Sequence, residues 1–155
     1  MMGESTQQTV RLIAGTKTSG EPVFEEVLVE RLAIPGHVRV LASPGVVLDV
    51  AAGDVIKVDS ENHEFSTVSR GGNLAIQVYG PHDAADSIER EMSALGGRID
   101  GRERNLTVFT VPASVGFPAV ERVLNLLTTR HAGVEWYYGN VYEKNDGVTP
   151  LKWWL

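Results

Sequence analysis

The stretch NLAIQVYGPHDAADSIEREMSALGGRIDGRERNLTVFTVPASVGFPAVERVLNLLTTRHAGVEWYYGNVYE, residues 73–143, decides the fold of the second half of the chain. Its hydrophobic period switches between the two-residue repeat of strands and the 3.6-residue repeat of helices. The predicted elements are, in order, strand 73–79, helix 83–95, strands 98–103 and 106–111, helix 117–132 and strand 134–142. This order predicts a split β-α-β, or ferredoxin-like, module with both helices on one face of a four-stranded antiparallel sheet.

Turn and cap residues mark the ends of both predicted helices. Asp83 is expected to cap the first helix, because its carboxylate can accept the free N–H groups of the first turn. Gly96-Gly97 ends that helix. The second helix begins after Ser114 or Gly116, with Pro118 in the first turn, where its missing N–H costs nothing. Each helix carries one apolar stripe. The stripes are Ala85, Ile88, Met92 and Leu95 in the first and Phe117, Val120, Leu124 and Leu127 in the second.

Ahead of this module, the sequence alternates between short apolar stretches and turns. Residues 24–32 follow a strand pattern, and Pro35-Gly36 predicts a tight turn into a strand over 37–42. Five or six short strands without a helix predict a small N-terminal sheet or partial barrel packed on the C-terminal module. We therefore expect an α+β protein whose junction is Gly71-Gly72. Its parts are a β-rich subdomain over 9–72, the module over 73–143 and an aromatic tail over 144–155. The sequence leaves open whether the first two parts are separate domains or share one continuous sheet.

Composition narrows the classes of function. The chain has 155 residues, no cysteine and a formal net charge of −6 at pH 7. The lack of cysteine excludes disulfides, thiolate metal sites and cysteine nucleophiles. The negative charge argues against nucleic acid, since phosphate binding depends on Lys and Arg, and it favours a basic partner. The sequence shows neither a signal peptide nor an apolar run near the roughly 18–20 residues that span a bilayer, so we expect a cytoplasmic location without membrane contact.

Residues that carry chemistry are scattered along the chain. The four histidines show no metal-binding spacing, and no glycine-rich phosphate motif or nucleophile motif is present. We therefore predict no catalytic residue, no cofactor and no metal site. If the protein were an enzyme, His63, Glu64 and His82 would be the first residues to test.

Aromatic residues gather toward the end of the sequence. In the last predicted strand, Trp136 and Tyr138 share one face and Tyr137 takes the other. Two interpretations of Trp153 and Trp154 stay open. Either the tail folds back and covers the open face of the sheet, or the tryptophans form an exposed patch for a partner. The candidate partner-binding residues are Tyr137, Tyr142, Trp153, Trp154, Glu61 and Glu64.

Two short stretches resemble a known family. Ala52-Gly53-Asp54-Val55 and HEFSTVSRGGNLAIQVYG, residues 63–80, are similar to an uncharacterised bacterial family known only as a domain of unknown function. The likeness covers residues 22–143. It implies a small, stand-alone, cytoplasmic protein with a β-rich first part and a β-α-β-β-α-β second part, and it supplies no catalytic residues. Residues 69–72 depart from the Ser-Gly-His-like joint that this family would lead us to expect.

These observations lead to a binding function. We expect a non-catalytic protein that binds another protein, most specifically an immunity-type inhibitor of a cognate bacterial toxin domain. The net charge, the spare aromatic residues and the lack of a catalytic constellation motivate this interpretation. The alternative is a small-molecule-sensing regulatory domain that resembles amino-acid-binding domains, with loops 80–83 and 96–97 as its binding places. The partner and the oligomeric state stay open.

Overall fold

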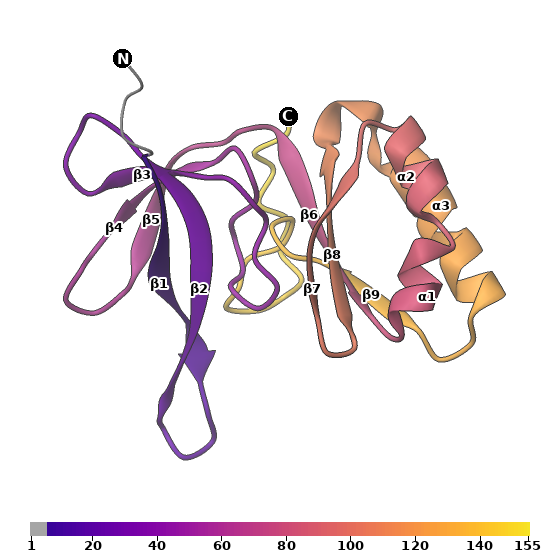
Figure 1. The fold of residues 1–155 in the computed structure, drawn as a ribbon, viewed down its shortest axis with the longest axis horizontal. Helices are drawn as coiled ribbons and strands as arrows, with labels where there is room; N and C mark the ends of the chain where they lie inside the picture. Colours follow the sequence, from indigo (N-terminus) through magenta and orange to yellow (C-terminus); the bar gives the residue numbers. More distant parts are fainter. Residues whose placement is uncertain (1–5) are drawn as a thin grey trace.

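The computed structural model describes residues 6–155, which form an α+β protein with two antiparallel sheets (Figure 1). The first sheet has strand order β1-β2-β3-β4-β5. Its strands are β1 (Gln7–Thr16), β2 (Pro22–Arg31), β3 (His37–Val40), β4 (Val55–Val58) and β5 (Phe65–Ser69). The backbone N–H of Ile13 in β1 donates to the carbonyl of His63 just ahead of β5, at 2.9 Å, so the two edges of this sheet approach each other. The predicted β-rich first part is thus present as a strongly curved meander.

The second sheet carries the elements that the decisive stretch predicts. Its strand order is β7-β8-β6-β9, and each neighbouring pair is antiparallel. The strands are β6 (Asn73–Tyr79), β7 (Arg98–Glu103), β8 (Leu106–Pro112) and β9 (Glu135–Tyr138). The helices are α1 (His82–Asp86), α2 (Glu89–Ala94), the short 3-10 helix η1 (Ala113–Val115) and α3 (Phe117–Arg130). Figure 1 shows α1, α2 and α3 together on one side of this sheet.

Each sheet has its own hydrophobic core, and the apolar stripes account for both. The second core contains the predicted helix residues Ala85, Ile88, Met92, Val120, Leu124 and Leu127 together with Leu74, Ile76 and Val78 of β6 and Phe109 and Val111 of β8. The first core is smaller and consists of Leu12, Val27, Val29, Val38, Val40, Val47, Val50 and Ile56. Val47 and Val50 come from the long loop between β3 and β4, so this loop is part of the folded body.

The first predicted helix is wrong in two details. It is broken into α1 and α2, because the Ser87 hydroxyl donates to the Ala84 carbonyl at 2.6 Å and Ile88 has φ −115° and ψ 3°. Asp83 is not the N-cap. The helix starts one residue earlier, at His82, and the cap position falls on Pro81 without a side-chain hydrogen bond. The Asp83 carboxylate therefore lies within the first turn, where a negative charge still suits the helix dipole. Gly116 does precede α3, as expected.

The last strand is shorter than the predicted 134–142. Beyond Tyr138 the backbone makes one more bond to β6, from the N–H of Gly139 to the carbonyl of Ala75 at 2.8 Å, and the fully buried side chain of Asn140 then takes over. Its Oδ1 accepts the N–H of Ala75 at 2.9 Å, and its Nδ2 donates to the carbonyl of Asn73 at 2.8 Å. One side chain thus satisfies two groups of β6 that a longer β9 would have paired.

The loop of residues 41–54 joins the two sheets across the face of the second sheet that lies opposite the helices. The Ser43 hydroxyl lies 2.6 Å from the Thr110 hydroxyl of β8, and the Ser43 N–H donates to Asp100 of β7 at 2.9 Å. Further along, the N–H of Asp49 donates to the carbonyl of Gly139 at 2.8 Å. This face is therefore partly covered by the first half of the chain.

The predicted junction at Gly71-Gly72 is a tight crossing. A Cβ on Gly71 would lie 2.4 Å from the carbonyl carbon of Gly53. Beside it, the carboxylate of Asp54, 1% exposed, accepts the N–H groups of Gly71 at 2.8 Å and Ala51 at 3.0 Å. Arg70 donates to Asp49 at 2.6 Å and to Asp54 at 3.4 Å. Burial raises the pKa of Asp54 above 3.8, against the effect of these hydrogen bonds and of Arg70.

The tail folds back, although not over the open face of the sheet. Tyr142 and Pro150 form an antiparallel bridge, which folds the tail back on the segment that precedes it. The Trp153 indole N–H donates to the carbonyl of Asn140 at 2.7 Å, and Arg70 lies 5.7 Å from the Trp153 ring. The Trp154 ring packs edge-on against Phe117 at 5.1 Å. The two tryptophans therefore cover the junction and the start of α3.

Candidate functional site

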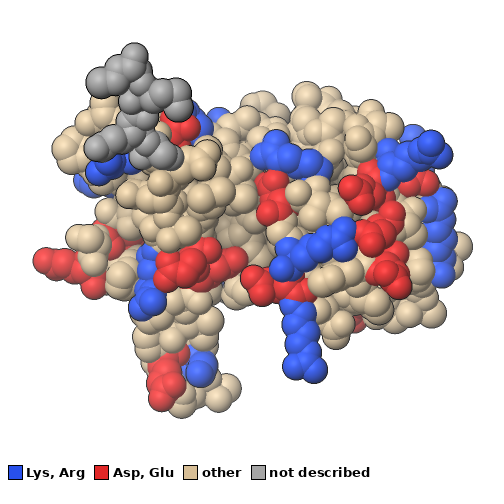
Figure 2. Space-filling model, in the orientation of Figure 1, with Lys and Arg blue, Asp and Glu red and all other residues tan. Residues whose placement is uncertain are grey.

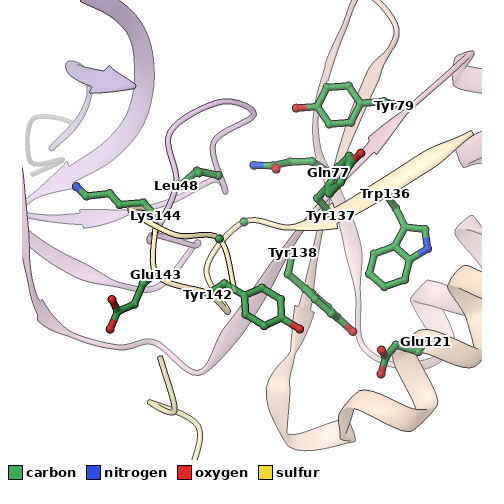
Figure 3. A pocket seen from close by; sticks show the side chains of 12 residues that line it. Leu48, Gln77, Tyr79, Glu121, Trp136, Tyr137, Tyr138, Tyr142, Glu143 and Lys144 are labelled. Carbon is green, nitrogen blue, oxygen red and sulfur yellow. The ribbon is translucent and has the colours of Figure 1, made fainter. Parts of the chain in front are cut away.

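A cleft of about 480 Å³ lies along β9, and we call it the aromatic cleft (Figure 3). It is within the size range of sites that hold small molecules or single side chains of a partner. Its walls come from the 41–54 loop, from β6, from α3, from β9 and from the segment that follows β9. The lining residues are Leu48, Gln77, Tyr79, Glu121, Trp136, Tyr137, Tyr138, Gly139, Tyr142, Glu143, Lys144 and Gly147.

The two faces of β9 both contribute to the aromatic cleft. Trp136 and Tyr138 are paired with Val78 and Ile76 and share their face, which is the face of the helices. Tyr137 is paired with Gln77 and lies on the opposite face, as the sequence predicted. A cleft that touches both faces of one strand must pass along the free edge of that strand. The aromatic cleft therefore follows the outer edge of β9.

Edge-to-face ring contacts hold the aromatic walls in place. On one face, the rings of Tyr79 and Tyr137 lie 5.8 Å apart, and on the other the rings of Trp136 and Tyr138 lie 5.2 Å apart. Phe117 of α3 supports Tyr138 from behind, with 5.4 Å between ring centroids. Such pairs contribute about 0.5–1.5 kcal/mol each beyond their burial. The walls are consequently ordered before any ligand arrives.

The polar groups of the cleft are incompletely satisfied. Gln77 is 3% exposed, and its amide nitrogen has no hydrogen-bond partner within residues 6–155. The Tyr138 hydroxyl is also buried without a partner in this part of the chain, and burial raises its pKa. By contrast, the Tyr137 hydroxyl donates to Glu135 at 2.9 Å, and this bond raises the pKa of Tyr137. Gln77 is therefore a hydrogen-bond donor that a ligand could satisfy.

The rim of the aromatic cleft is mainly acidic. Glu121 and Glu143 line it, Glu135 stands at the start of β9, and none of the three forms an ion pair within residues 6–155. The ammonium group of Lys144 is turned toward the first sheet, 5.5 Å from the ring of Phe65. Elsewhere the charges are mixed, and Figure 2 shows acidic and basic side chains interspersed over the half that holds the helices. The rim thus favours a cationic ligand.

The structure separates the six residues proposed for partner binding into three places. Tyr137 and Tyr142 lie together in the aromatic cleft. Trp153 and Trp154 pack at the junction and line a different cavity, beside Arg70 and Phe117. Glu61 and Glu64 lie in the turn between β4 and β5 of the first sheet.

Of the ten side chains that line the cleft, the sequence proposed Tyr137 and Tyr142 and missed the other eight, among them Gln77, Tyr79 and Glu121. The alternation of β6 already put Gln77 and Tyr79 on the face opposite the core, next to Tyr137 once β9 pairs with β6. The sequence therefore contained a signal, the alternation of β6, that could have identified Gln77 and Tyr79. Glu121 is brought in by the docking of α3, which no local pattern encodes.

The residues considered for catalysis have separate local partners. The His63 ring packs against Phe24 at 5.2 Å, and the His82 Nε2 lies 2.6 Å from the carbonyl of Glu103. The N–H of Glu64 donates to Asn62. No group of three or more His, Asp or Glu side chains within residues 6–155 is placed to hold a metal ion. In the same part of the chain, no helix is both long and apolar enough to cross a bilayer.

Comparison with known proteins identifies the family and the fold. The model of a family described as "Domain of unknown function (DUF4265)" matches residues 25–136, which confirms the resemblance to an uncharacterised family. A hypothetical protein from Neisseria gonorrhoeae has a similar structure, with a TM-score of 0.62 at 14% sequence identity. The match covers 90% of this chain and 96% of the other, and at this identity it concerns the fold alone. No functionally curated protein matches the chain.

Proposed function

Because the chain belongs to the family of unknown function DUF4265, whose description names no activity, we propose a function from the geometry of the aromatic cleft. The protein is a non-catalytic binding protein that holds another protein at this cleft. The observation that carries the proposal is the ordered aromatic wall around the edge of β9, in which Tyr79, Trp136, Tyr137, Tyr138 and Tyr142 surround one cavity. Tyrosine and tryptophan in partly buried clusters supply most of the energy at protein interfaces.

The more specific form of this proposal is an immunity-type inhibitor of a basic toxin domain. The acidic rim formed by Glu121, Glu135 and Glu143 supports it, together with the net charge of −6. Acidic groups around an aromatic centre accelerate encounter with a basic partner and orient it. In this form the protein acts by covering a surface of the toxin domain, and it needs no reaction of its own.

The finer fold assignment belongs to the same proposal. The strand order β7-β8-β6-β9, with two crossovers that contain helices, supports a ferredoxin-like module for residues 73–143. That arrangement leaves β9 at one edge of the sheet, which is where the aromatic cleft lies.

The test is co-expression with the product of the adjacent gene, followed by calorimetry on the purified pair. Tyr137→Ala and Tyr142→Ala should each weaken binding at least tenfold, because each removes an aromatic contact from the centre of the interface. Ile34→Ala is the matched control, since Ile34 is also apolar and exposed but lies in the turn before β3. The absence of a complex, or equal affinity for all three variants, would refute the proposal.

A second candidate is the binding of a small molecule, and the unpartnered amide of Gln77 favours it. The ligand would be an amino acid or a nucleotide that offers an oxygen acceptor to this amide. The place differs from the loops 80–83 and 96–97 expected for a sensor, because the lining residues of the aromatic cleft include neither loop. A thermal-shift screen should show stabilisation that Gln77→Leu removes. A screen without any stabilisation would eliminate this candidate.

A further inference from the structure

The outer edge of β9 presents backbone groups that no strand pairs. β9 is bonded to β6 alone, and the N–H of Gly139 donates to the carbonyl of Ala75 at 2.8 Å. Bonded and non-bonded pairs alternate along an antiparallel ladder. Tyr137 therefore bonds toward β6, while Trp136 and Tyr138 turn their N–H and C=O groups away from it. Within residues 6–155, no hydrogen bond reaches these four outward groups.

The other edge of the same sheet is protected, and the contrast shows that the edge of β9 is exceptional. β7 carries the charged residues Arg98, Asp100, Arg102 and Glu103, and its pairing with β8 is interrupted by a bulge between Ile99 and Gly101. Charge and bulges are the usual means by which proteins prevent an edge strand from pairing further. The pairing of β9 with β6 has no such irregularity, and the two residues whose backbone groups point outward, Trp136 and Tyr138, are aromatic.

We propose that the edge of β9 accepts an extended basic segment of a protein partner as an added strand. The inference rests on the proposed function and specifies how the partner binds. The backbone groups of Trp136 and Tyr138 would supply the hydrogen bonds, as in other complexes in which a peptide extends a sheet. Alternate side chains of the segment would then enter the aromatic cleft from the two faces of β9, against Tyr137 on one face and Tyr138 on the other.

Charge selects this occupant over a second copy of the chain. Glu121 and Glu143 line the aromatic cleft and Glu135 begins β9, all three without ion-pair partners within the described residues, so a lysine or arginine on the segment would meet an opposite charge. Pairing of two β9 strands would instead bring two such acidic rims together. The amide of Gln77, buried on the Tyr137 face, adds a donor for an oxygen of the segment.

Hydrogen exchange of single amides followed by NMR tests the free and bound edge directly. In the free protein, the amides of Trp136 and Tyr138 should exchange fast, and that of Tyr137 should exchange slowly because it bonds β6. The probe is a heptapeptide of alternating lysine and valine, acetylated and amidated at its ends. On binding it should protect Trp136 and Tyr138 at least tenfold and leave Tyr137 unchanged. The same peptide with glutamate in place of lysine is the charge control and should not bind.

N-methylation of the peptide provides a second, matched test. The N–H groups of successive residues in a strand point to opposite edges, so methylation of one alternate set should abolish binding and methylation of the other should not. Equal binding of both methylated peptides would overturn the inference, as would the absence of binding of the parent peptide at about 1 mM. In the complex with the full partner, dependence on Tyr137 without protection of Trp136 and Tyr138 would reject edge pairing and keep the proposed function.

Discussion

Gly53 and Gly71 set how closely the two halves of the chain approach each other. Their backbones are in contact, and a side chain on Gly71 would collide with the main chain of Gly53 at 2.4 Å. Neither backbone can move freely, because the Asp54 carboxylate binds the N–H of Gly71 on one side and that of Ala51 on the other. A methyl group at this point forces the backbone apart.

We therefore predict that Gly71→Ala lowers the free energy of unfolding by about 2–3 kcal/mol, through overpacking. Gly101→Ala is the matched control, because an added Cβ there meets no atom within 4 Å, and it should change stability by less than about 0.5 kcal/mol. Urea unfolding followed by circular dichroism measures both. Equal stability of the two variants would mean that the crossing relaxes easily.

For single residues, the sequence predicted which face of a strand each side chain takes, but it did not predict the contacts that depend on which strands pair. The faces of Trp136, Tyr137 and Tyr138 followed from the two-residue period of a strand. Nothing local indicated that Asn140 would replace two backbone bonds or that Gln77 would be left without a partner. Both outcomes depend on which strand lies next to β6, and a single sequence does not encode that locally.

Among the elements, the 41–54 loop depends on one carboxylate of β2. Glu25 accepts the N–H groups of Gly45, Val46 and Val47 at 2.7, 2.9 and 2.8 Å. Glu26, the next residue, points to the opposite face and forms an exposed ion pair with Arg11. The two-residue period of a strand places these neighbours on opposite sides, although it does not indicate what either binds.

Glu25→Ala should release the loop and cost about 2–3 kcal/mol, because three donors lose a charged acceptor. Glu26→Ala should cost less than about 1 kcal/mol, as expected for an exposed pair. Hydrogen exchange should accelerate at Val46 and Val47 in the first variant alone. Unchanged exchange at these two amides in Glu25→Ala would contradict the assigned role.

In the helices, the spacing of apolar residues predicted the buried face but not the continuity of the helix. The apolar stripe of α3 was correct, since Val120, Leu124 and Leu127 are all fully buried. The stripe of the first helix was also correct at Ala85, Ile88 and Met92, yet the helix is broken between α1 and α2. Hydrophobic spacing records which side faces the core, whereas a local bond such as that of Ser87 to Ala84 decides continuity.

For the whole molecule, the contacts between the halves predict a single cooperative unfolding transition. All three tryptophans lie in the second half, so fluorescence reports on that half, while circular dichroism reports on both sheets. Because the 41–54 loop contributes to the first core and also binds β7 and β8, the two probes should give the same urea midpoint. Separate midpoints would show that the halves unfold independently.

The α+β class followed from the order of the elements, but the number of cores and the arrangement of the halves did not. The expected boundary at Gly71-Gly72 stays a prediction, and its turn chemistry gave no hint of the backbone contact with Gly53. The sequence left open whether the tail folds back or stays exposed, and its position against Arg70 and Phe117 depends on distant segments. Such convergence is a property of the assembled molecule.

The difference between the two edges of the second sheet also limits how copies of this protein can associate through that sheet. A filament needs two complementary edges, so that one edge of each copy pairs with the other edge of the next copy. Here β9 can add a strand, while the charged and bulged β7 ends the sheet. If two copies paired through β9, the assembly would therefore end as a closed twofold pair. Fibre formation through this sheet is blocked even when no partner occupies the edge of β9.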